Sequence, residues 1–221
     1  MSYNQEVING VLHDLRTPIS RIRFSLKLLE EAKNNYELNS RTSAIEEDIA
    51  EIESLISEIL DYGKLDQAGT AIKLEKIHIN KLLESAIDNF KKLYPNKSII
   101  VEIPGNAITL LANAKHIMRA LQNLLQNAGR FSNSLVKLSF AKRNSCHHQI
   151  SIEDDGPGIP SGDRERIFEP FVQLKNQPKN ISHGYGFGLA ITKKILDQHD
   201  WKIAVTDSDM GGAKILITIP S

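Results

Sequence analysis

The first part of the chain is dominated by apolar residues at helical spacing. They recur at three- and four-residue steps between residues 7 and 29, and a second such stripe with acidic residues between its members runs from 45 to 60. Asn34-Asn35 interrupts the pattern, and Asn39-Ser40 is expected to cap the second helix. The sequence therefore predicts two helices joined by a short polar turn, an αα-hairpin.

A two-helix hairpin of this size has too little core to stand alone, because each apolar stripe needs a further partner. A second copy of the chain would supply that partner and complete a four-helix bundle, so we expect a homodimer. The alternative is that the stripe packs on the remainder of the same chain.

Beyond the hairpin the periodicity becomes mixed, and the small residues at 67–71 predict a linker. We expect a helical domain at 1–68 and a second domain at 72–221. The fold class is α+β, a helical hairpin followed by an α/β sandwich of a mixed sheet under helices. The strands are expected at 73–79, 98–103, 107–112, 135–142, 149–153, 202–206 and 214–219, and the helices at 80–94, 114–129 and 187–198.

Composition narrows the classes of partner. Lysine plus arginine and aspartate plus glutamate both number 27, so the balanced charge gives no reason to expect nucleic acid as a partner. No window approaches the roughly 20 apolar residues of a membrane helix, and no signal peptide precedes the first motif. The single cysteine, Cys146, excludes an intramolecular disulfide and favours a reducing compartment. We expect a soluble, cytoplasmic fragment of a longer protein.

A candidate reactive site lies inside the first predicted helix, where residues 13–18 read His-Asp-Leu-Arg-Thr-Pro. Proline in a helix interior costs about 3 kcal/mol, so Pro18 needs a justification. His13 falls off the apolar stripe, and its ring is expected to face solvent. Asp14 can accept a hydrogen bond from Nδ1–H of His13, which leaves Nε2 of His13 free to attack an electrophile. A surface ion pair is the plainer interpretation of these two residues alone.

Three further segments carry ligand-binding chemistry. Asn123 and Asn127 are four residues apart on one helical face, and amide oxygens suit Mg²⁺ held between phosphates. Asp154 follows a strand and precedes a glycine turn, so its carboxylate could accept a hydrogen bond from an exocyclic amine such as that of adenine. The alternating glycines of 184–188 precede a helix and can form a phosphate cradle of backbone N–H groups. Polar surface, a bare turn and a structural glycine loop are the respective alternatives.

Taken in order, these pieces resemble the conserved boxes of bacterial sensor histidine kinases, in the branch that contains EnvZ, CpxA and RstB, with RstB nearest. The resemblance covers the chain from about residue 7 to 220. It lies in the H box (13–18), N box (123–127), G1 box (154–158), F box (168–171), G2 box (184–189) and G3 position (211–212).

This resemblance implies a dimerisation and histidine-phosphotransfer hairpin followed by a Bergerat-type (GHKL) ATP-binding domain. His13 would be the phospho-acceptor, Asp14 its general base, and Thr17 the residue that aligns water during dephosphorylation of a partner response regulator. The cofactors would be ATP and Mg²⁺, with Asn127 as the metal ligand. The nucleotide site would comprise Asn123, Asn127, Arg130, Phe131, Asp154, Gly156, Gly158, Lys175, Lys179, Gly184, Gly186, Gly188 and Leu189.

The full-length family member would also have a periplasmic sensor and membrane helices in the bacterial inner membrane, so this chain would meet a membrane only through segments it lacks. One departure concerns the lid between residues 172 and 183, where relatives often carry arginines and this chain has only Lys175 and Lys179. A lysine neutralises phosphate as a point charge but lacks the bidentate fork of arginine. A GHKL ATPase of another kind and a non-catalytic dimer module are the alternative functions.

Overall fold

The computed structural model describes residues 3–31, 34–66, 72–144, 147–174 and 185–220. They form two compact units, Met1–Lys64 and Leu65–Ser221. The expected linker at 67–71, Cys146, Lys175, Lys179 and Gly184 lie outside the described residues. Within the described ranges, no helix combines the length and the apolar composition that crossing a bilayer requires.

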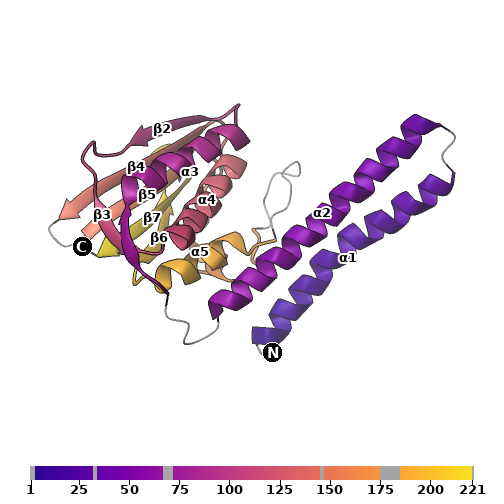
Figure 1. Cartoon of the computed structure of the whole chain (residues 1–221), viewed down its shortest axis with the longest axis horizontal. Coiled ribbons are helices and arrows are strands. Elements are labelled where there is room, and N and C mark those ends of the chain that lie inside the picture. The colour runs from indigo at the N-terminus through magenta and orange to yellow at the C-terminus, as the bar shows by residue number, and fades with distance from the viewer. Residues whose placement is uncertain (1–2, 32–33, 67–71, 145–146, 175–184, 221) are drawn as a thin grey trace. The chain divides into compact units, whose positions relative to one another are not determined.

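The first unit is the predicted helical hairpin (Figure 1). Helix α1 spans Tyr3–Glu30 and continues through Pro18, and helix α2 spans Asn35–Asp66. The expected cap at Asn39-Ser40 is wrong, because α2 has already begun there. Asn34 caps it instead: its Oδ1 accepts from the backbone N–H of Glu37 at 2.9 Å, and its Nδ2 donates to the Glu37 carboxylate at 3.0 Å.

The hairpin alone leaves much of its apolar surface exposed. Leu55 is fully buried, yet other large apolar side chains of both helices remain 41–63% exposed. These are Leu12, Ile19, Phe24, Leu26, Ile49, Ile56 and Leu60. An exposed apolar set of this extent on a two-helix unit favours association with another surface.

The second unit is built on a five-stranded mixed sheet with the strand order β2-β4-β5-β7-β6. Strands β2 and β4 pair in parallel, and the other neighbours pair antiparallel. A separate antiparallel pair joins β1 and β3. The strand bounds are β1 Glu75–His78, β2 Ser98–Glu102, β3 Thr109–Ala112, β4 Leu135–Asn144, β5 His147–Asp154, β6 Lys202–Asp207 and β7 Ala213–Pro220. The predicted mixed sheet is therefore confirmed.

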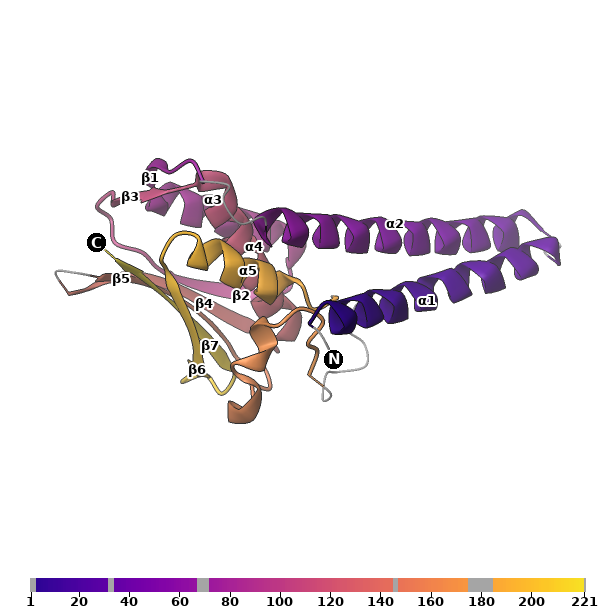
Figure 2. The same cartoon turned by 90° about the horizontal axis from the view of Figure 1, so that it is seen from below.

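Helices α3 (Ile79–Leu93), α4 (Ala114–Phe131) and α5 (Gly188–Asp197) lie on one face of this sheet, as Figure 2 shows. Side chains of β4, β5 and β7 alternate, so every second one points into the layer between the sheet and the helices. Phe140, Ile150 and Ile217 are at most 2% exposed there. Two short 3₁₀ turns, Ser161–Asp163 and Arg166–Phe168, lie between β5 and α5.

Asn80 does not cap α3 as expected. The helix begins one residue earlier, and the Asn80 side chain instead holds the loop before β3. Its Nδ2 donates to the carbonyl of Pro104 at 2.8 Å, and its Oδ1 accepts from the N–H of Ile108 at 3.1 Å. A long-range contact thus replaces the local cap that the sequence suggested.

Gly129 allows α4 to approach α3 closely. A Cβ atom at this position would lie 2.7 Å from a ring carbon of Tyr94 and 2.8 Å from one of Phe90. The Tyr94 hydroxyl also donates to the carbonyl of Gln126 at 3.1 Å, so the tyrosine ring is held against α4 at that position.

We expect Gly129→Ala to lower the free energy of unfolding by about 1–3 kcal/mol, because two rings must move. Gly63 is the matched control, since it also lies in a helix but a Cβ there would meet nothing within 4 Å. Gly63→Ala should be neutral or stabilising by up to about 1 kcal/mol. Denaturant unfolding of both variants tests this, and equal effects would contradict the packing argument.

Candidate nucleotide-binding and phospho-acceptor sites

Asp154, the last residue of β5, is the centre of the first candidate site. Its side chain is almost fully buried, at 7% exposure. Oδ1 accepts two backbone hydrogen bonds, from Gly156 N–H at 2.9 Å and from Ala213 N–H at 3.2 Å. These two donors orient the carboxylate and leave Oδ2 for another donor.

Burial raises the pKa of Asp154, and the negative charge of Asp155 raises it further, although the two backbone donors act in the opposite direction. A buried carboxylate with a raised pKa lacks a full set of partners for its charged form. A polar ligand that donates to Oδ2 would supply one.

Two glycines allow three backbone segments to converge on this carboxylate. A Cβ atom at Gly156 would lie 2.4 Å from the carbonyl oxygen of Phe131, at the end of α4. At Gly212, in the β6–β7 turn, a Cβ would lie 2.3 Å from both the carbonyl oxygen and Oδ1 of Asp154. Any larger residue at either position would collide with backbone, so the site depends on glycine for space.

Four half-buried side chains of α4 extend the candidate site. Asn127 follows Asn123 by one turn, and both are half-buried, as are Arg130 and Phe131 in the last turn. Nδ2 of Asn123 donates to the carbonyl of Gly188 at 3.1 Å, which ties α4 to the start of α5. Asn123 therefore positions the start of α5 through this bond, in addition to any ligand contact.

The F box and the described part of the G2 box meet at the start of α5. Phe171 has φ of 64°, in the left-handed region that a bulky residue rarely adopts. Its ring packs edge-on against Phe187, with 4.4 Å between ring centroids, and a Cβ at Gly186 would lie 2.9 Å from the Phe171 backbone. Gly158 and Gly186 both have positive φ, at 73° and 75°. Leu189 is half-buried in the first turn of α5.

The second candidate site lies on α1 of the first unit. The backbone of His13 is helical, but its side chain is outside what the structure describes, so the expected exposure of its ring stays a prediction. Asp14 is half-buried, and Thr17 is exposed. Thr17 borders a groove between α1 and α2 with a volume of about 830 Å³.

Arg21 crosses that groove. Its Nε donates to Oδ1 of Asp48 at 2.7 Å, and its terminal nitrogen also pairs with Glu51, so one cation of α1 binds two acids of α2. Burial acts to lower the pKa of Arg21, but the attraction of Glu51 and Asp48 outweighs it and the pKa is raised. Asp48 is buried at 7% exposure, and Arg21 gives it a charged partner.

The site residues that sequence reasoning missed are those that support Asp154 rather than those that would touch a ligand. Ala213 supplies one of its two donors, and the close approach of Gly212 to Asp154 was not anticipated although 211–212 was named as the G3 position. The glycine pair at 211–212 was the available signal, because paired glycines in a turn indicate close backbone contact.

Comparison with known proteins identifies both units. Residues 3–68 match the model of the His Kinase A (phospho-acceptor) domain, and residues 112–221 match that of the histidine kinase-, DNA gyrase B- and HSP90-like ATPase. Escherichia coli K12 Sensor histidine kinase CpxA is 30% identical over 222 residues, covering 100% of this chain and 48% of the relative. Sensor protein RstB of the same strain is 30% identical over 216 residues, covering 98% of this chain and 48% of the relative.

These relatives confirm the expected branch, with CpxA and RstB at equal identity. The chain spans about half the length of each. Among solved structures, full-length ShkA in complex with AMPPNP superposes with a TM-score of 0.71 at 24% identity, over 100% of this chain and 46% of ShkA, which shows the same fold. The chain belongs to the histidine kinase family and comprises its phospho-acceptor domain and its GHKL-type ATPase domain.

Proposed function

We propose that this chain uses ATP to phosphorylate itself on His13 and then passes the phosphoryl group to an aspartate of a response regulator. The observation that carries the proposal is the presence in one chain of a phospho-acceptor hairpin with His13 and Asp14 and an ATPase domain with a cradled carboxylate, Asp154. A GHKL ATPase of another kind would have no use for a phospho-acceptor hairpin.

In this proposal Asp154 binds the base of the nucleotide. Its Oδ2 accepts a hydrogen bond from the exocyclic amine of adenine, while Gly156 and Ala213 hold Oδ1. Arg130 and Phe131 lie at the end of α4, beside the same turn, as a cation and an aromatic face for the nucleotide. The ShkA complex with AMPPNP supports a nucleotide in this fold.

The phosphates would lie between α4 and the glycine loop before α5. The first backbone N–H groups of α5, from Gly188 onward, have no partner within the helix, and together with the positive end of the helix dipole they favour an anion. Lys175 and Lys179 would neutralise phosphate charge. Asn127 would hold Mg²⁺ through its amide oxygen, a hard neutral ligand of the type this ion prefers, and the ion would neutralise phosphate charge.

The chemical step is a displacement at the γ-phosphorus. His13 Nε2 donates its lone pair to phosphorus, the bond to the bridging oxygen breaks, and ADP leaves with that electron pair. Asp14 accepts from Nδ1–H, keeps Nε2 unprotonated and stabilises the positive charge that develops on the ring. An aspartate oxygen of the regulator then attacks the phosphorus and displaces His13 Nε2.

The hairpin would act as a homodimer. Its exposed apolar residues on both helices, together with the match to the phospho-acceptor domain, support a four-helix bundle with a second copy. We further propose that the full-length kinase is anchored in the bacterial inner membrane by segments outside this chain, with these two units in the cytoplasm, and that nucleic acid is not a partner.

Asp154→Asn should weaken ADP binding about 10- to 100-fold, because a charged acceptor is lost. It should also change stability with a defined sign. Since the folded pKa lies above the ordinary 3.8, the folded chain holds the proton more tightly, and ionisation costs stability as pH rises through the window between the two pKa values. The nucleotide-free variant should gain stability relative to wild type across that window and keep the gain at pH 7.

Calorimetry with ADP and denaturant unfolding from pH 3 to 8 measure the two effects. Asp197→Asn is the matched control, since Asp197 is an exposed partner of Lys193 on α5. Equal ADP affinity for the Asp154 variant and wild type would remove the adenine role.

His13→Ala should abolish autophosphorylation and leave ADP affinity within about twofold of wild type, because the nucleotide site lies in the other unit. Incubation with γ-labelled ATP and Mg²⁺, followed by acid and base treatment, tests this: a phosphohistidine is acid-labile and base-stable. Acid-labile label on the alanine variant would show that another residue accepts the phosphoryl group.

Thr17→Ala should slow dephosphorylation of the phospho-regulator about tenfold or more and change the initial rate of His13 labelling less than twofold. Thr17 is exposed one turn after His13, where its hydroxyl can orient a water beside a docked regulator. Thr42→Ala on α2 is the matched control, because its hydroxyl donates to the carbonyl of Leu38 in the same helix. Parallel loss of both activities would indicate a backbone effect next to Pro18 instead.

A further inference from the structure

Asp154 is the middle one of three consecutive acids, and its two neighbours point elsewhere. Strand alternation turns Asp154 toward the helices and Glu153 toward the opposite face of the sheet. Asp155 follows the end of β5. Each neighbour binds a different turn, and these are the two turns that meet at Asp154.

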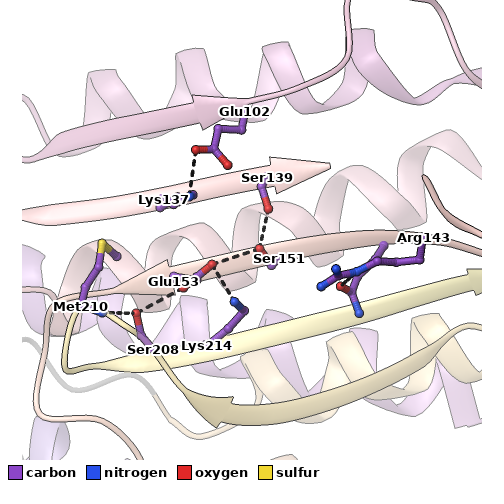
Figure 3. Close-up of polar contacts among 10 residues, drawn as sticks. Glu102, Lys137, Ser139, Arg143, Ser151, Glu153, Ser208, Met210 and Lys214 are labelled. Carbon is purple, nitrogen blue, oxygen red and sulfur yellow. Dashed lines mark hydrogen bonds and ion pairs between the residues drawn. The ribbon is translucent and has the colours of Figure 1, made fainter. Parts of the chain in front are cut away.

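Glu153 binds the β6–β7 turn. Its carboxylate is buried at 5% exposure and pairs with Lys214 Nζ at 3.1 Å, as Figure 3 shows. It also accepts from the hydroxyls of Ser151 at 3.3 Å and Ser208 at 3.4 Å. Ser208 is the first residue of the turn, and its own hydroxyl accepts from Met210 N–H at 3.1 Å.

The turn held in this way delivers a donor to Asp154. Ser208 N–H donates to the carbonyl of Gly212 at 2.9 Å, which closes the turn. The next residue, Ala213, then donates to Asp154 Oδ1 at 3.2 Å. Glu153 on one face of β5 therefore fixes the backbone that orients Asp154 on the other face.

Asp155 binds the turn between α4 and β4. Its two oxygens accept from Ser134 N–H at 3.1 Å, from the Ser134 hydroxyl at 2.9 Å and from Leu135 N–H at 3.1 Å. Burial acts to raise the pKa of Asp155, but the donors of Leu135 and Ser134 outweigh it and the pKa is lowered. The ionised carboxylate is thus the form that the turn requires.

This second turn starts directly after Phe131, whose carbonyl oxygen lies against Gly156. Lys97 also binds this turn, with Nζ at 2.6 Å from the carbonyl of Ser132 and 2.8 Å from that of Asn133. Asp155 consequently fixes where α4 ends relative to Asp154, and with it the position of Phe131.

We propose that Glu153 and Asp155 are positioning residues for adenine recognition, each of which holds one of the two turns that meet at Asp154 without touching the nucleotide. The inference rests on the proposed adenine role of Asp154. It predicts that loss of either acid changes the orientation of the Asp154 carboxylate and selectively weakens its hydrogen bond to the exocyclic amine of adenine. General damage to the domain would instead weaken every contact with the nucleotide.

The test compares ADP with purine riboside 5′-diphosphate, which lacks the amine, by calorimetry or competition. The ratio of the two affinities measures the amine contact alone. In Glu153→Gln and in Asp155→Asn this ratio should fall about three- to tenfold, because an amide has one acceptor oxygen where the carboxylate has two. Asp197→Asn is the matched control: it removes an exposed ion pair with Lys193 within α5 and should keep the wild-type ratio.

Ser208→Ala and Ser134→Ala remove single contacts of the same two turns. They replace the acid variants in this test if an acid variant does not fold. An unchanged ratio in the folded variants, or an equal loss of affinity for both nucleotides, overturns the positioning role. A wild-type chain that binds both nucleotides equally would instead overturn the adenine role of Asp154, and this inference with it.

Discussion

The close approach of three backbone segments around the Asp154 carboxylate is the constraint on which the nucleotide-binding half depends. The end of α4, the turn after β5 and the turn before β7 meet within distances that only Gly156 and Gly212 allow. The meeting buries a carboxylate, raises its pKa and gives it two fixed backbone donors. In the proposed function, the protein thus keeps an energetically costly group oriented for a donor that arrives with the ligand.

Helix α4 links this point to the rest of the site. Its buried face includes Leu121, Leu124 and Leu125, each at most 2% exposed. Asn123 ties it to the start of α5, and Gly129 sets its distance from α3. A shift of α4 would therefore move several candidate ligand contacts together, which is how a site assembled from separate segments keeps its geometry.

The strands and helices could be predicted from periodicity to within a few residues, because the alternation in β4, β5 and β7 matches one buried face. Capping was less predictable. Asn34 rather than Asn39 caps α2, and Asn80 binds a loop 24 to 28 residues away instead of its own helix. Several asparagines offered the same local chemistry, and only the folded chain decides which of them finds a donor.

The residues of the candidate site also differ in how far the sequence could predict them. Residues with a sequence signature, such as Asp154 with its glycines, could be named in advance, and the structure brings them together. Glu153 and Asp155 could not, because the role proposed for them follows from β5–β7 register and from turns distant in the sequence. Three neighbouring acids look alike in a sequence, but Glu153 and Asp154 are buried on opposite faces of β5 and Asp155 lies just past its end.

The central claim is that Asp154 is a poised carboxylate whose missing partner is the nucleotide. The most direct measurement is the ¹³C chemical shift of the Asp154 carboxyl, titrated against pH with and without ADP. The account predicts an apparent pKa above 3.8 in the free protein and a lower one with ADP bound, because a donor to Oδ2 favours the charged form. A titration of Asp154 that ADP leaves unchanged would contradict it.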